Sequence, residues 1–315
     1  MLTRRQIRVK VMQAVYAHYN GNLLSLNEGK NAIAKSCNDM ILLHTTLLYL
    51  FKALWEYAVE QNNIQLKQRR GEAPLNENYA KIMHLSPLAL IAKHPFLSKK
   101  IEEYKLNIWD LEFDFVRQLF EKIVSSEIYL TYKELDTSNF KKQQKLFVQL
   151  FKEIIAPDER LFRYIEDLNI QWVDDLPVVN TFILKQLRKL REEDMSSVAF
   201  PDLVHRTEDI GFGKSLYEQV IVNHETLQKE FDGKTPNWDK DRIAKLDGLL
   251  IKIAIAELIY FQDIPPKVSL NEYLELAKEY STPKSNQFIN GVLDRLVKDY
   301  VKSGRLKKEG RGLLE

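Results

Sequence analysis

The most constraining feature of this sequence is residues 265–296, PPKVSLNEYLELAKEYSTPKSNQFINGVLDRL, which predict two consecutive helices. The two leading prolines end any preceding helix, because proline cannot continue one. Ser269 and Glu272 have the spacing of a capping box, so a helix is expected to begin at Ser269. Thr282 followed by Pro283 predicts the start of the second helix. The stretch therefore predicts a helical hairpin.

A glycine, Gly291, lies inside the second predicted helix. A glycine at such a position costs about 1 kcal/mol relative to alanine. Since helices seldom carry that cost without a reason, Gly291 predicts the close approach of another backbone.

Two segments of the chain carry a resemblance to a known family. PPKVSLNEYLELAKEY followed by KSNQFINGVLDRL closely resembles the C-terminal signature of the NusB family, which comprises all-helical bacterial transcription antitermination factors. RRQIRVKVMQAVY resembles that family's N-terminal helix, with Gln13, Ala14 and Tyr16 on family positions. The resemblance implies an all-α fold, a NusB-like helical bundle with an additional helical region.

Composition limits the classes of protein to which this chain can belong. It has 315 residues, of which 45% are hydrophobic and 29% charged, which is ample for a buried core. The single cysteine, Cys37, excludes an intrachain disulfide, and a reducing, cytoplasmic setting is expected. The sequence predicts no signal peptide, and its most apolar stretch is too short to cross a bilayer, so no membrane role is expected.

The N-terminal residues predict a helix with an unusual charge pattern. Thr3 and Gln6 have capping-box spacing. Arg4, Arg5 and Arg8 then crowd the first turns, where cations oppose the helix dipole, and each such effect costs a few tenths of a kcal/mol. Cations at the start of a helix without nearby acids indicate that an anion from outside the helix binds there.

An aromatic side chain accompanies these arginines. Tyr16 lies near Arg5 in angle around the predicted helix, and guanidinium groups beside an aromatic ring suit single-stranded RNA. The alternative is a solvated basic face with a half-buried tyrosine. The family resemblance favours RNA, because the arginine-rich start of that family's first helix binds RNA, and it adds Gln13 to the site.

A second candidate cluster begins the last long helix. Lys284 and Phe288 are i,i+4 neighbours, which suits a phosphate and a stacked base. The alternative is that Phe288 is a core residue. The resemblance implies that this phenylalanine and its neighbours contact RNA, which adds Ser285 and Gln287, although the family more often has a lysine at the position of Gln287.

The resemblance also organises the chain into segments. Residues 1–20 are expected to form an N-terminal RNA-binding helix, 198–303 the NusB-like core, 21–197 a helical insertion and 304–315 a basic flexible tail. A weak repeat relates the segments from Lys145 and from Lys214, with Trp172 matching Trp238. The insertion could be a degenerate duplication of the core, or the likeness could reflect similar helix–loop–helix patterning.

The sequence carries no recognisable catalytic constellation. Its six histidines are scattered, and no metal-binding spacing or glycine-rich nucleotide loop is present, so neither an enzyme nor a cofactor is expected. The resemblance implies an antitermination factor that binds boxA-type RNA of ribosomal RNA transcripts with NusE, a small-subunit ribosomal protein. It would act on the elongating RNA polymerase complex.

Two alternatives to that function remain open. One is a protein-interaction module whose insertion covers the RNA face. The other is the RNA-binding part of a system that modifies ribosomal RNA.

Overall fold

The computed structural model describes residues 3–21, 25–68, 75–133, 139–200, 207–233 and 244–313. Helices connected by turns account for the regular structure of these residues, and no strand occurs among them, which confirms the predicted all-α class. The chain divides into two compact units, one of residues 38–201 and one of residues 2–37 together with 202–315.

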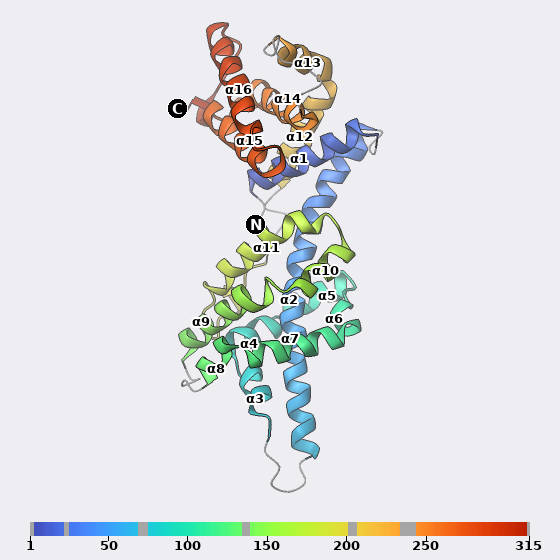
Figure 1. Ribbon diagram of the computed structural model, residues 1–315, viewed down its shortest axis with the longest axis vertical. Coiled ribbons are helices and arrows are strands. Elements are labelled where there is room, and N and C mark those ends of the chain that lie inside the picture. Colours follow the sequence, from blue (N-terminus) through green and yellow to red (C-terminus); the bar gives the residue numbers. More distant parts are fainter. Residues whose placement is uncertain are drawn as a thin grey trace. The chain divides into compact units, whose positions relative to one another are not determined.

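The discontinuous unit holds α1 (Arg4–Tyr19), the first residues of α2 (Leu26–Gln68), α12 (Thr207–Val222), α13 (His224–Asp232), α14 (Lys245–Tyr260), α15 (Pro266–Tyr280), α16 (Ser285–Lys302) and the 3-10 turn η5 (Gly310–Leu313). Helix α14 is its centre and contacts α1, α12, α13, α15 and α16 (Figure 1). From Asp247 to Leu258 nearly every residue of α14 is buried, because apolar side chains cover all sides of this helix. Segments from both ends of the chain therefore share one core.

The continuous unit holds the rest of α2, followed by α3 (Glu77–Met83), α4 (Ser86–Ala92), α5 (Pro95–Glu103), α6 (Ile108–Leu111), α7 (Phe113–Ser125), α8 (Glu127–Lys133), α9 (Phe140–Leu150), the π-helical turn η1 (Phe151–Ile155), α10 (Glu159–Leu168), α11 (Trp172–Leu187) and the 3-10 turn η2 (Met195–Ser197). The core of this unit is aromatic. The ring of Phe51 on α2 contacts Phe147 and Phe151, and the indole of Trp109 donates to the carbonyl of Thr46 at 2.8 Å.

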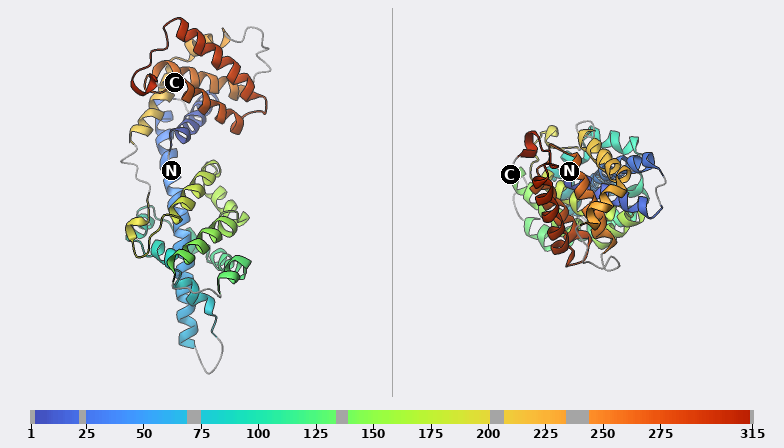
Figure 2. Two further views of the ribbon diagram at one scale, coloured as in Figure 1. Left: turned by 90° about the vertical axis from the view of Figure 1, so that its left-hand side faces the viewer. Right: turned by 90° about the horizontal axis from the view of Figure 1, so that it is seen from above.

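Both helices of the predicted C-terminal hairpin form, and α15 and α16 lie side by side (Figure 2). Their starts differ from the prediction. Helix α15 begins at Pro266, so Ser269 is not an N-cap but a fully buried helix residue. Helix α16 begins at Ser285 and its N-cap is Lys284, whereas the sequence predicted Thr282 as the N-cap. By contrast, the capping box of Thr3 and Gln6 is confirmed.

The polar stretch at residues 62–78 is only partly a loop, because α2 continues to Gln68 and α3 begins at Glu77. Residues 69–74, together with Trp238 of the proposed repeat, lie outside the described residues.

The C-terminal tail differs from the expected flexible segment. Lys308 donates to the carbonyl of Phe261 at 2.8 Å, and the amide of Glu309 donates to the carbonyl of Gln262 at 3.0 Å. Gly312 is buried, and a Cβ added there would lie 1.9 Å from the oxygen of Gln262. Residues 308–312 therefore pack against the turn that follows α14.

Gly291 does not mark a close backbone approach, because nothing lies within 4 Å of a Cβ built there. A crowded helical glycine is Gly29 of α2, where a Cβ would lie 2.0 Å from Cζ of the buried Tyr217. We expect Gly29→Ala to lower the free energy of unfolding by about 1–3 kcal/mol, as overpacking of a filled core does.

Gly291→Ala is the matched control for this substitution. It should raise the free energy of unfolding by about 1 kcal/mol, because only the backbone entropy of a helical glycine changes. Urea titrations followed by circular dichroism measure both changes. Equal effects of the two substitutions would contradict the packing assigned to Gly29.

Candidate nucleic-acid interface

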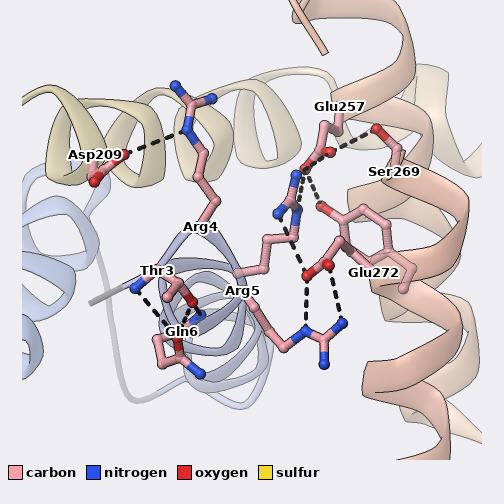
Figure 3. A network of polar contacts seen from close by, with 10 residues as sticks. Thr3, Arg4, Arg5, Gln6, Asp209, Glu257, Ser269 and Glu272 are labelled. Atoms are coloured by element: carbon pink, nitrogen blue, oxygen red, sulfur yellow. Dashed lines mark hydrogen bonds and ion pairs between the residues drawn. The ribbon is translucent and has the colours of Figure 1, made fainter. Parts of the chain in front are cut away.

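The three N-terminal arginines each meet carboxylates from distant parts of the chain (Figure 3). Arg4 lies 3.4 Å from Asp209 of α12 and 3.8 Å from Asp263. Arg5 donates two hydrogen bonds of 3.0 Å to the carboxylate of Glu272 on α15. The side chains of Arg4 and Arg5 remain 41% and 42% exposed. Both guanidinium groups are therefore held at the surface by internal counter-charges.

Arg8 has a different environment, since its side chain is only 2% exposed. It donates to both carboxylate oxygens of Glu257 at 2.8 and 2.7 Å, and Ser269 and Tyr273 donate to the same carboxylate. Burial opposes the charge on Arg8, but the hydrogen bonds and negative charge of Glu257 outweigh it and raise the arginine pKa. Burial, with the same negative charge, also raises the pKa of Tyr273, which stays a neutral donor.

These contacts change the interpretation of the arginine cluster. The acids that offset its unfavourable position in the first turns of α1 come from α12, α14 and α15, so an external anion is not needed to explain it. Arg8 does not lie on a surface where it could reach a phosphate. Glu257 could have been suspected from the sequence, because it is an isolated acid in the apolar run from Ile253 to Leu258 and such an acid needs a buried cation.

In the second predicted cluster, at the start of α16, some residues are exposed and one is buried. Lys284 and Gln287 are exposed, and Phe288 is half-buried. Ser285 is 1% exposed, and its hydroxyl donates to Asp247 of α14 at 2.7 Å. Ser285 therefore joins the first turns of α14 and α16, which leaves the other three residues to face a ligand.

The remaining predicted residues lie further along α1. Gln13 is partly exposed, and Tyr16 is 47% exposed. Helix α1 contacts α12 and α14, while α16 contacts α14 and α15. Both predicted clusters thus pack on one central helix, α14, although they come from opposite ends of the chain. Arg8 attaches to its last turn through Glu257, whereas Ser285 attaches to its first turn.

Two further features of the described residues bear on metal binding and on membrane insertion. No group of three histidine, cysteine, aspartate or glutamate residues is arranged to hold a metal ion in the part of the chain that the structure describes. Within the same residues, every helix falls short of the length or apolarity that crossing a bilayer requires.

Comparison with known proteins identifies the C-terminal part of the chain. Residues 182–298 match the model of the NusB family. Three curated relatives carry the name transcription antitermination protein NusB. The protein from Chloroherpeton thalassium is 37% identical over 41% of this chain and 62% of its own length. The protein from Salinibacter ruber is 41% identical over 33% of this chain and 64% of its own length, and that from Methylacidiphilum infernorum is 40% identical over 28% and 59%.

The matched region covers about three fifths of the length of these curated relatives. No solved structure is significantly similar to this chain. The family match begins in α11 and ends in α16, so α1 and most of the continuous unit lie outside it. On this evidence the chain contains a NusB family domain at residues 182–298, and its N-terminal part extends beyond that domain.

Proposed function

We propose that this protein is a cytoplasmic transcription antitermination factor, which binds boxA-type RNA of ribosomal RNA transcripts together with NusE and acts on elongating RNA polymerase. The observation that carries the proposal is the NusB family domain, whose named relatives are antitermination proteins. Its mechanism is binding without chemistry. Residues 1–20 supply the RNA-binding helix, 198–303 the core, and 21–197 an insertion.

The proposed RNA surface consists of the exposed and partly exposed members of the predicted set. Arg4, Arg5 and Lys284 contact phosphates, and Tyr16 and Phe288 stack on bases, while Gln13 and Gln287 add polar contacts. Arg8 and Ser285 support this surface from within, through Glu257 and Asp247. Phosphate binding by Arg5 requires that the RNA compete with Glu272 for the guanidinium group.

We expect Arg5→Glu to weaken binding of a boxA-like RNA without unfolding the protein. Arg5 is 42% exposed, and an ion pair so open to solvent contributes little to stability. The dependence of affinity on salt should also decrease, by a slope of about 0.7 for each lost phosphate contact. Fluorescence anisotropy at two salt concentrations, with and without NusE, measures both effects.

Glu272→Gln is the matched control, since it weakens the same ion pair but keeps the cation. If Arg5 binds phosphate, Glu272→Gln should leave RNA affinity unchanged or raise it. If the ion pair only maintains structure, both substitutions should weaken binding equally, and the assignment of Arg5 fails. Absence of selective RNA binding by the wild-type chain, even with NusE, would instead favour the protein-interaction alternative.

A further inference from the structure

A surface pocket of about 400 Å³ lies in the discontinuous unit, between the C-terminal end of α1 and helices α13 and α14. The side chains and backbone that define its chemistry are Tyr16, Tyr19, Gln228, Lys245, Gly248 and Lys252. Of these, only Tyr16 was predicted from the sequence to contact a ligand.

One wall of the pocket is aromatic. Tyr16 and Tyr19 are one helical turn apart on α1, so they share a face, and they are 47% and 38% exposed. Tyr19 is fixed in place, because its hydroxyl lies 2.7 Å from Nδ1 of His224 and the Lys252 ammonium lies 4.9 Å from its ring centre. Burial raises the pKa of Tyr19 to about 12, so this ring remains a neutral phenol. Tyr19 is therefore a fixed part of this wall, beside the exposed ring of Tyr16.

The floor of the pocket is Gly248, inside helix α14. A Cβ at this position would meet only the Phe231 ring, at 3.7 and 3.9 Å, which are ordinary contact distances. Packing alone therefore does not require a glycine, although a glycine inside a helix costs about 1 kcal/mol relative to alanine. The missing side chain leaves open the space between the neighbouring helices.

Polar groups surround this floor. Lys245 and Lys252 lie three residues before and four residues after Gly248, so the three share one face of α14. Lys245 is exposed, and the ammonium of Lys252 donates to the neutral amide of Gln228 at 3.2 Å. The same amide donates to Asp232 at 2.9 Å. Cations for a phosphate thus lie beside amide and carboxylate groups that can meet the polar edge of a planar ligand.

We propose that this pocket binds one nucleobase of a single-stranded RNA, stacked on Tyr16 above Gly248, with an adjoining phosphate at Lys245. The proposal rests on the proposed RNA-binding function and adds Tyr19, Lys245, Gly248 and Lys252 to its surface. An aromatic wall beside cations is the combination that single-stranded nucleic acids use, since every base has a face that can stack.

The test fills the pocket from its floor. Gly248→Gln places a side chain in the base position, whereas Gly248→Ala adds one methyl group and serves as the control; both residues favour the helix more than glycine does. The full-length chain is titrated with a boxA-like RNA and with a series of the same RNA in which each nucleotide in turn is made abasic. Circular dichroism checks that each variant is folded.

For the wild-type protein, removing the base at one position of the RNA should lower the affinity about 10-fold, which is the effect of one stacked base. Gly248→Gln should bind the intact RNA about 10-fold more weakly and lose nothing further at that position, while Gly248→Ala should match the wild type. Tyr16→Leu, a substitution of an exposed residue, should remove the same positional effect, which keeps the test decisive if Gly248→Gln does not fold.

Three results would overturn the proposal. If Gly248→Gln binds RNA as tightly as Gly248→Ala does and keeps the abasic profile, the pocket holds no base, although the proposed function stands. If the filled pocket weakens binding of NusE but not of RNA, the pocket is a protein contact. If the wild-type chain binds no RNA, the proposed function and this inference both fail.

Discussion

Replacing Glu257 with alanine will lower the free energy of unfolding of the discontinuous unit by about 3–5 kcal/mol, the effect expected when one member of a buried ion pair is removed. The reason is the environment of Arg8, which is 2% exposed and donates two hydrogen bonds to this carboxylate. Without Glu257 the guanidinium group stays buried, with Glu272 at 3.7 Å as its nearest remaining carboxylate. Ser269 and Tyr273 lose an acceptor at the same time.

The double substitution Arg8→Met with Glu257→Leu is the control, because it removes both charges and fills a similar volume. It should cost less than Glu257→Ala, because no unpaired charge remains buried and only the acceptor of Ser269 and Tyr273 is lost in both variants. Urea unfolding monitored by circular dichroism measures both variants. A loss below about 1 kcal/mol for Glu257→Ala would contradict the buried ion pair, because breaking such a pair costs several times more.

The second large effect is a loss of stability of the continuous unit in mild acid. His44 is fully buried in α2, and its Nε2 lies 3.1 Å from the Gln186 amide oxygen, which assigns the imidazole proton to Nε2. Its Nδ1 has no hydrogen-bond partner. A second proton on Nδ1 would find no acceptor there, and burial lowers the pKa of His44 to about 4.

The sign of the pH effect follows from this lowered pKa. Between pH 6.5 and about 4 the unfolded chain binds the proton and the folded chain does not, so stability is fully present above pH 6.5 and decreases as the pH falls. The loss attributable to His44 is about 3 kcal/mol, at about 1.4 kcal/mol for each unit of pKa.

His44→Gln, which cannot titrate, should remove that part of the pH dependence. Urea unfolding at pH 7 and pH 4.5 separates the two proteins. An identical loss in the wild type and in His44→Gln would contradict the assignment and shift it to other titrating groups, such as His94, whose pKa burial also lowers.

The fold class and the helices near both ends of the chain could be predicted because apolar spacing and proline positions are local signals. The capping box of Thr3 and Gln6 was correct, since both residues lie in one turn and nothing distant competes for them. The identical signal at Ser269 and Glu272 failed because tertiary contacts took both side chains. Ser269 donates to Glu257, and Glu272 pairs with Arg5.

The sequence could predict which residues belong to the candidate site, but not which of them are exposed. Sequence pattern marked the N-terminal arginines as unusual, but it could not show that their anions lie more than 200 residues away in the chain. Similarly, the family resemblance grouped Ser285 with Lys284, whereas the hydrogen bond from Ser285 to Asp247 places the serine in the core. Long-range partners decide which polar residues remain available, and no local pattern encodes them.

The discontinuous unit also has a consequence for the order of events during protein synthesis. Arg8 and its partner Glu257 are separated by 249 positions. At about 5–20 residues per second, the ribosome needs roughly 12–50 seconds to supply that partner after Arg8 has been made. During this interval residues 38–201 are completed and can fold as a unit, while the basic helix α1 exists without the carboxylates that later neutralise it. We therefore expect the nascent helix α1 to have its strongest attraction for anionic surfaces, including RNA close to the ribosome, before the core closes around Arg8.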